Sequence, residues 1–385
     1  MKAPKMELTL FRTEAVYTPS PTKRGGAILV GNGRVLAAGN ERAVMDAIRT
    51  RHDRSKGFDL EILDLPGMTA VPGFVDTHVH GGGGADFMDA TPEAAGAALK
   101  THLDEGTTSI VATLMAAPAA DLLRAMAAID AAAAAHLLPA VLGFHLEGPF
   151  ISREKRGAQN EKHIRPYPPA PEMARLLKSA GRRIRIVTLA PEIPGAEAFI
   201  RFLQSRRIVP SAGHSNATFE QARAGIRAGI RHGTHLFNAM TGLFHRDPGL
   251  AGALLLDDRV AVEMIADGIH LHPAILSLVV RIKPLDKIVL VTDASRPAGQ
   301  SHDPLRTAEG RLFGSAITLA RAIRNMILWT GLPLEKILPM ATIVPARIAG
   351  AGRKGRLTSG ADADIVLLDE KLAVKGVFLR GKRYL

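Results

Sequence analysis

The sequence of 385 residues contains no cysteine, which excludes disulfide bonds and any metal site built on thiolates. A metal ion would have to be held by histidine, aspartate and glutamate, and the chain has 14 histidines. Aromatic residues are also scarce: one Trp, three Tyr and 13 Phe amount to 4% of the chain, so few rings are available to stack on nucleic-acid bases. The side chains that remain for chemistry are mainly imidazoles and carboxylates.

Long apolar segments are absent as well. No run reaches the roughly 18 residues that a membrane-spanning helix needs, and the start MKAPKMELTLFRTEAVYTP lacks the apolar region and cleavage site of a signal peptide. We therefore expect a cytoplasmic protein without membrane contact. The net charge is +12, from 49 Lys and Arg against 37 Asp and Glu, but the basic residues are scattered. This disfavours the alternative of a nucleic-acid-binding protein and suits an anionic small molecule.

The chain divides into segments of two kinds. Residues 1–68 and 350–385 contain short strand-like stretches separated by Gly and Asn turn signals, and we expect them to pair into one small β-sandwich domain. Residues 69–349 alternate apolar strands with helical stretches. One of these helices has Thr91 in position to cap it and Pro92 at its first position.

Eight strand-like segments occur in residues 69–349. The first ends at His80, and the others are TTSIVATLM, AVLGFHLEGPF, RIRIVTLAPE, RIVPSAGHS, RHGTHLFNAM, VAVEMIADGIHLH and KIVLVTDAS. This count predicts an α/β fold with a (β/α)8 TIM-like barrel. A doubly wound sheet is the alternative. The barrel is favoured because polar residues stand at the C-terminal ends of many strands, and these ends converge only if the sheet closes.

The first strand ends in the stretch PGFVDTHVHGGGG, residues 72–84. Because side chains alternate along a strand, His78 and His80 point to the same face. Two imidazoles on one face suit a metal ion, and four glycines would let the backbone approach an ion or a substrate closely. The alternative is one core histidine, one solvated histidine and an ordinary loop. This stretch alone leaves both interpretations open.

The other strand ends favour a metal site, because they carry Glu147, His214, His235 and Asp293. A closed barrel would bring four imidazoles and two carboxylates to one mouth. Such nitrogen and oxygen ligands suit zinc, or divalent iron, manganese or cobalt. Asp293, at the end of the last strand, is placed to take a proton from a water whose pKa a metal has lowered towards about 7. The residues therefore predict metal-assisted hydrolysis.

Several motifs of this chain resemble, in order, those of the N-acetylglucosamine-6-phosphate deacetylases of the amidohydrolase superfamily. They are PGFVDTHVHGGGG, HLEGPF, AGHSNAT, THLFNAM, RDPGLAG, IADGIHLH and VTDA, with the ending GRLTSGADADIVLLD. The resemblance implies hydrolysis of N-acetyl-D-glucosamine 6-phosphate to D-glucosamine 6-phosphate and acetate by a homodimeric enzyme. N-acetylgalactosamine 6-phosphate and a cyclic amide are alternative substrates. Glu147, where cyclic-amide hydrolases more often have a carbamylated lysine, disfavours the cyclic amide.

The resemblance also implies which residues bind metal. Glu147, His214 and His235 would hold the principal ion, and His78 with His80 would complete a second site. We therefore expect one or two divalent ions per subunit, zinc first among them. Some family members lack the His-x-His pair and work with one ion, so the pair permits two ions without requiring them.

Catalysis and substrate binding are assigned in the same way. Asp293 would activate water and then protonate the leaving amine. The sugar would contact His270, and the phosphate would be received by Asn238, the backbone of Ala239, and Arg246. Where some members have a histidine that polarises the substrate carbonyl, this chain has Gln159, which we place among the substrate-binding residues. The segment after Asp293 is also shorter than in those members, so substrate preference could differ.

Overall fold

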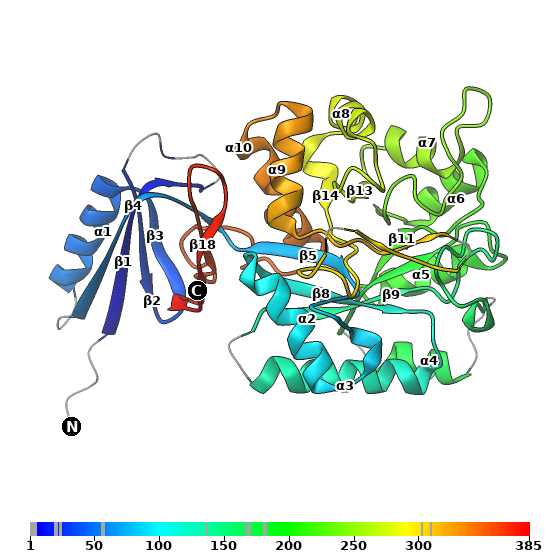
Figure 1. Cartoon of the computed structure of the whole chain (residues 1–385), viewed down its shortest axis with the longest axis horizontal. Helices are drawn as coiled ribbons and strands as arrows, with labels where there is room; N and C mark the ends of the chain where they lie inside the picture. Colours follow the sequence, from blue (N-terminus) through cyan, green and yellow to red (C-terminus); the bar gives the residue numbers. More distant parts are fainter. Residues whose placement is uncertain are drawn as a thin grey trace.

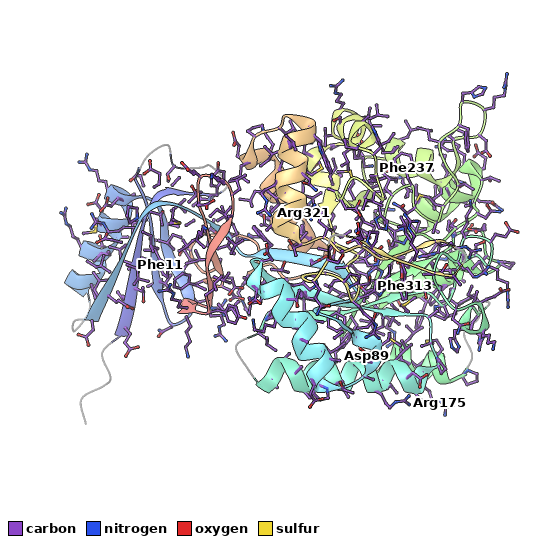
Figure 2. The ribbon with its side chains drawn as sticks, in the orientation of Figure 1. Phe11, Asp89, Arg175, Phe237, Phe313 and Arg321 are labelled. Atoms are coloured by element: carbon purple, nitrogen blue, oxygen red, sulfur yellow. The ribbon has the colours of Figure 1, made fainter. Side chains whose placement is uncertain are left out.

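The computed structural model describes residues 6–18, 22, 25–54, 58–135, 138–165, 167, 171–179, 183–301, 303–308 and 310–385. Residues 1–5 of the expected small domain thus lie outside the described residues. The chain forms two parts, a small sheet built from both of its ends and a larger barrel beside it (Figure 1). Phe11 marks the core of the small part and Phe313 lies in the barrel part (Figure 2).

Seven strands form the small sheet. Their order is β19 (Lys382–Arg383), β18 (Val374–Leu379), β17 (Ile365–Leu368), β4 (Phe58–Pro72), β1 (Met6–Val16), β2 (Gly26–Gly31) and β3 (Arg34–Asn40). The central strand β4 pairs parallel with β1 and antiparallel with β17, and so joins the two ends of the chain. Both halves of the sheet contribute to one apolar core, where Phe11 and Phe378 meet edge to face with centroids 4.8 Å apart. The sheet is therefore folded over as a sandwich.

Helix α1 (Glu41–Arg54) covers the other face of the small sheet, and the sequence pattern did not predict it. Val44 and Ile48 lie on one side of the helix because they are four residues apart. Both are buried in a cluster with Leu8 and Leu29. Val44 and Ile48 are the only buried residues among residues 41–50, and so short an apolar stripe does not stand out in the sequence.

The barrel contains the eight predicted strands in parallel order. They are β5 (Phe74–Val79), β8 (Thr107–Met115), β9 (Ala140–Glu147), β10 (Ile184–Leu189), β11 (Val209–Ala212), β12 (His232–Gly233), β13 (Ala261–Met264) and β14 (Ile288–Leu290). The first and last strands meet through a parallel bridge between Val79 and Ala294. The Asp293 N–H also donates to the His78 carbonyl at 2.8 Å. This contact closes the sheet, so the (β/α)8 prediction is confirmed.

Helices surround the barrel (Figure 1). They are α2 (Pro92–Asp104), α3 (Ala119–Ala135), α4 (Pro171–Ser179), α5 (Ala196–Ser205), α6 (Phe219–Ala228), α7 (Gly249–Leu256), α8 (Pro273–Ile282), α9 (Leu319–Thr330), α10 (Leu334–Ile337) and α11 (Ile343–Ile348). Thr91 caps α2 as predicted, because its hydroxyl accepts the Ala94 N–H at 3.2 Å. Within the described ranges no single helix is long and apolar enough to cross a membrane. Only α9 taken together with Leu334–Ile348 meets the length and composition, and that pair is bent by 119°.

The four glycines after His80 serve the closure of the barrel. The N–H groups of Gly83 and Gly84 donate to the carbonyls of Ala298 and Arg296, both at 2.8 Å. Their φ angles of +61° and +85° favour glycine. None of residues 81–84 is among those that line the cavity at the barrel mouth. These glycines therefore let the chain pack closely against its own segment after β14, and the alternative of a loop without contact to an ion or a substrate holds for them.

Candidate metal centre

Six polar side chains from the C-terminal ends of the barrel strands converge at one mouth. His78 lies in β5 and His80 directly after it, Glu147 ends β9, and His214, His235 and Asp293 follow β11, β12 and β14. All six are at most 8% exposed. The structure thus brings together every residue that the sequence analysis placed at the metal or in proton transfer.

Glu147, His214 and His235 form what we call the first ligand set. Glu147 Oε1 lies 3.0 Å from the Nε2 atom of each histidine, and the two Nε2 atoms are 3.1 Å apart. Zinc ligands about 2.0–2.1 Å from a tetrahedral ion lie roughly 3.3 Å from one another. His214 Nδ1 lies 2.8 Å from the Lys155 carbonyl and donates to it, so the lone pair of Nε2 faces this group. The donor atoms fit a divalent ion.

His78, His80 and Asp293 form the second ligand set. Their Nε2, Nε2 and Oδ1 atoms are separated by 3.3 to 3.4 Å. The carboxylate of Glu147 also faces this set, with Oε1 3.4 Å from His78 Nε2 and Oε2 3.3 Å from His80 Nε2. Glu147 therefore stands between the two sets, where it can bridge two ions.

Three of these residues have an unusual backbone. His214, His235 and Asp293 have φ angles of +48°, +30° and +47°. This left-handed region costs a residue with a Cβ of order 1–3 kcal/mol, and it persists only where the surroundings hold it. Each of the three stands two or three residues after the end of a barrel strand and projects a ligand into the mouth. Half of the six side chains at the mouth therefore stand on backbone of this strained kind.

The electrostatics of the cluster favour bound cations. Burial would raise the pKa of the Glu147 carboxyl, but the imidazoles of His214 and His78 outweigh burial and hold this pKa well below its usual range. Burial would lower the pKa of His80, yet the carboxylates of Asp293 and Glu147 raise it to about 9. Without metal, the imidazole of His80 is therefore protonated at neutral pH, and a metal ion that binds there must displace this proton.

Gln159 supports the first ligand set from the cavity wall. Its Nε2 donates to Glu147 Oε2 at 2.6 Å, and its Oε1 accepts the Ala116 N–H at 2.8 Å. The side chain is buried, and it also lines the cavity. In this structure, the amide of Gln159 is therefore hydrogen-bonded to the carboxylate of the ligand Glu147. Whether Gln159 also touches substrate, as the sequence analysis expected, stays a prediction.

A cavity of about 370 Å³ opens above the two ligand sets. His270, Asn238 and Ala239, which the sequence analysis assigned to the substrate, line it. Its other lining residues include Glu154, Lys155, Arg311, Leu312 and Phe313. Arg311, Leu312 and Phe313 come from a small hairpin, β15 (Leu305–Arg306) and β16 (Leu312–Phe313), within the segment after Asp293. The short segment thus forms one wall of the cavity.

His270 is held by an aspartate that the sequence analysis did not single out. His270 Nδ1 donates to Asp267 Oδ2 at 2.7 Å, and Asp267 Oδ1 accepts the main-chain N–H groups of Ile269 and His270, both at 2.8 Å. The bond at Nδ1 leaves Nε2 of the imidazole available to a ligand. The spacing of Asp267 and His270 in IADGIH was the available signal.

Arg246 lies outside the cavity lining. It is exposed on the loop of residues 242–247, where its Nη1 donates to His245 Nε2 at 2.8 Å. Among the described residues, the Lys and Arg side chains that line the cavity are Lys155 and Arg311, and neither stood out in the sequence. The role of Arg246 at the phosphate stays a prediction. It requires that the loop folds over its own cavity or reaches that of a second subunit.

Two further buried groups, His145 and Glu263, lie below the mouth, and the sequence analysis named neither. His145 is two residues before Glu147 on the same face of β9, and its Nε2 accepts the Thr188 hydroxyl at 2.7 Å. Burial and the neighbouring His78 lower the pKa of His145 to about 3, so its imidazole is neutral. The hydrogen-bonded chain continues from Thr188 through Thr234, Ser211 and His232. Glu263, on β13, contacts His78 directly.

Comparisons with known proteins agree with this site. Residues 69–384 match the model of the amidohydrolase family. The chain is 35% identical over 348 residues to the N-acetylglucosamine-6-phosphate deacetylase of Lysinibacillus sphaericus, covering 86% of this chain and 89% of that protein. It is 37% identical over 327 residues to the N-acetylgalactosamine-6-phosphate deacetylase of Escherichia coli O157:H7, covering 81% and 86%.

The fold is shared with a solved structure. A mutant of the N-acetyl-D-glucosamine-6-phosphate deacetylase of Mycobacterium smegmatis, in complex with N-acetyl-D-glucosamine 6-phosphate, superposes with a TM-score of 0.85 at 34% sequence identity. The match covers 98% of this chain and 99% of that one, so it includes both the small sheet and the barrel.

Proposed function

The chain belongs to the amidohydrolase family, and from this premise we propose that it hydrolyses the acetamide of N-acetyl-D-glucosamine 6-phosphate to D-glucosamine 6-phosphate and acetate. The observation that carries the proposal is the position of Glu147, between two sets of buried ligands at the bottom of a 370 Å³ cavity. Relatives along most of the chain carry this activity in their names.

The chain's own residues support each step of such a reaction. A divalent ion bound at this site supplies Lewis-acid chemistry, polarising the amide carbonyl and making water a better nucleophile at neutral pH. Asp293 lines the cavity and is held by its main chain, whose N–H bonds to the His78 carbonyl. In the proposed mechanism its carboxylate takes the proton of the attacking water. It returns that proton to the nitrogen as the carbon–nitrogen bond breaks, which leaves acetate and the free amine.

Binding of the sugar phosphate involves the remaining cavity residues. His270 would contact the sugar, and Asn238 and the backbone of Ala239 would receive the phosphate at the loop after β12. Lys155 and Arg311 add positive charge to the lining, which favours an anionic substrate. We assign zinc as the first candidate for the metal and two ions as the full complement.

A second candidate substrate is N-acetyl-D-galactosamine 6-phosphate. A relative at 37% identity carries that activity in its name, and the short hairpin wall of the cavity is where the two sugars could be distinguished. The two substrates differ only in the configuration of one hydroxyl, so the metal centre serves both alike. Preference between them therefore depends on the cavity wall.

The test is acetate release by purified protein of measured metal content. We expect turnover of N-acetylglucosamine 6-phosphate, loss of turnover after chelation, and recovery with zinc or another divalent ion. N-acetylgalactosamine 6-phosphate is assayed in parallel, with unphosphorylated N-acetylglucosamine and dihydroorotate as controls. Faster hydrolysis of dihydroorotate would replace the proposal with a cyclic-amide hydrolase. Full activity in metal-free protein would remove the metal from the mechanism.

We further propose a cytoplasmic homodimer. Leu243 and Phe244, on the same loop as Arg246, are 47% and 67% exposed, and two adjacent exposed apolar side chains beside the expected phosphate ligand suit a contact with another subunit. Light scattering after size exclusion measures the mass. A monomer at micromolar concentration would contradict the dimer and leave the activity proposal untouched.

A further inference from the structure

Glu263, on β13, is fully buried. A single oxygen of its carboxylate, Oε2, contacts residues of both ligand sets. Oε2 accepts the His78 Nδ1–H at 2.8 Å and the main-chain N–H of His235 at 3.0 Å. His78 belongs to the second ligand set and His235 to the first. The two bonds meet at a single atom, so neither residue can shift without changing the geometry of the other.

The buried charge of Glu263 must be compensated by its neighbours. Burying a charge is costly unless it is paired and hydrogen-bonded. The other Glu263 oxygen, Oε1, has no hydrogen-bond partner among the described residues, and His232 Nε2, which is 3.8 Å from Oε1, has none either. The two N–H donors on Oε2, both from residues of the ligand sets, are therefore what offsets its burial. This links Glu263 to the cations that the ligand sets would hold.

We propose that Glu263 is a positioning residue that couples the two metal subsites. By accepting from Nδ1 it keeps the His78 proton on that nitrogen, so that the lone pair of Nε2 points to the second ion. The same bond makes His78 a more basic ligand. By accepting the N–H of His235 it holds a residue whose φ of +30° is strained, and so keeps His235 aligned with the first ion. The inference rests on the proposed metal centre and is independent of the substrate.

The coupling has a measurable consequence. Outer-shell partners of metal ligands typically change metal affinity by about 10–100-fold. In Glu263→Gln the amide oxygen can still accept N–H groups, but the negative charge is lost. We expect the dissociation constant of the second ion to rise by about 10–100-fold, and that of the first ion to rise by a smaller factor. Glu263→Ala, which releases both N–H groups, weakens both ions more.

Asp76 provides the matched control. It is also a fully buried carboxylate that contacts His78, but through the main chain: Oδ1 accepts the His78 N–H at 3.1 Å, and Oδ2 accepts the Thr292 hydroxyl at 2.6 Å. The amide of Asp76→Asn can keep its oxygen on the His78 N–H. We expect this variant to bind both ions as the wild type does.

The experiment is a metal titration of chelator-treated wild type, Glu263→Gln and Asp76→Asn. Zinc dissociation constants come from competition with a chromophoric chelator. Cobalt(II) absorption bands report the coordination of each ion, which a loss of stability alone would not alter. Circular dichroism confirms folding. If Glu263→Gln does not fold, Glu263→Asp replaces it, because it keeps the charge but withdraws the oxygen by one methylene.

The outcomes separate the inference from the proposed function. Wild type that binds no ion tightly overturns the metal centre itself. Wild type that binds one ion only, or two ions whose constants and cobalt bands are unchanged in Glu263→Gln, overturns the coupling alone. If Asp76→Asn loses metal as Glu263→Gln does, then removing the charge of any buried carboxylate near His78 has this effect. That result would also overturn the coupling. Selective weakening of the second ion in Glu263→Gln supports the proposal.

Discussion

The two ligand sets at the barrel mouth are built from different parts of the sheet. The first set follows β9, β11 and β12, which lie within one continuous run of parallel strands. The second set combines β5 with the residue after β14, the two end strands of the sheet order. A continuous ladder supports the first set, whereas the second exists only where the barrel closes on itself.

The second subsite therefore depends on closure of the whole barrel, whereas the first depends only on neighbouring strands. The ligand atoms of the first set are 3.0 to 3.1 Å apart, and those of the second are 3.3 to 3.4 Å apart. Across the closing seam, the bridge between Val79 and Ala294 takes the place of a full strand ladder. We therefore expect the second subsite to hold its ion more weakly and to lose it first.

The largest expected effect is that of Asp293, which belongs to the second ligand set and, in the proposed mechanism, also transfers the proton. Asp293→Asn should lower kcat by about 10²–10⁴-fold, because the amide can neither accept the water proton nor return it to the amine. The first ligand set is intact in this variant, so at least one ion should remain by elemental analysis. A kcat within a few-fold of wild type, at unchanged metal content, would remove Asp293 from proton transfer.

The next effect compares the two ligand sets directly. Glu147→Gln should weaken both ions, since the Glu147 carboxylate faces both sets, and by more than the 10–100-fold of an outer-shell change. His80→Gln, the matched control, should lose only the second ion. Metal stoichiometry after dialysis is the measurement. Full stoichiometry in Glu147→Gln would show that Glu147 is not a principal ligand.

A change remote from both ligand sets tests phosphate recognition. Charge-assisted hydrogen bonds are worth about 1.5–3 kcal/mol, so Arg246→Ala should raise KM for the phosphorylated sugar by roughly 10–150-fold. Activity on unphosphorylated N-acetylglucosamine, which we expect to be low, should hardly change. An unchanged ratio of kcat/KM for the two sugars would leave Arg246 as a solvated loop residue.

Mixed dimers would show whether Arg246 serves the cavity of its own subunit or that of a second subunit. Arg246→Ala subunits are combined with Asp293→Asn subunits, and the kcat/KM of the mixture is compared with that of each variant alone. If Arg246 reaches the cavity of a second subunit, the mixed dimer contains one site with both residues and recovers activity. If it acts within its own chain, no site is complete and the mixture gains nothing.

The smallest effect is a pH dependence of the second ion. The pKa of His80 is raised to about 9, so in metal-free protein its imidazole is protonated at neutral pH. The second ion must displace this proton, and its affinity should therefore fall as pH falls, by about tenfold per unit for each displaced proton. Zinc titrations at several pH values between neutrality and pH 9 measure this slope. A flat profile would contradict the shifted pKa.

Local patterns were enough to predict much of this molecule. The eight strands and the six residues at their ends follow from alternation along each strand and from turn signals, which depend on a few neighbouring residues. Thr91 as a helix cap is local in the same sense. By contrast, α1 was not predicted, because only Val44 and Ile48 among residues 41–50 are buried. Their partners in the small sheet are far from them in sequence.

What the sequence by itself determined is therefore the set of candidate ligands and the strands that carry them. Only the tertiary structure decided which of these side chains face one another, because strand pairing and barrel closure join residues that are far apart along the chain. Glu263 shows this most clearly. In the sequence it is a single carboxylate within an apolar strand, and its two partners, His78 and His235, are separated from it by 185 and 28 positions. The closed barrel brings all three into contact, whereas it leaves Arg246 outside the cavity, on a loop whose position no local pattern specifies.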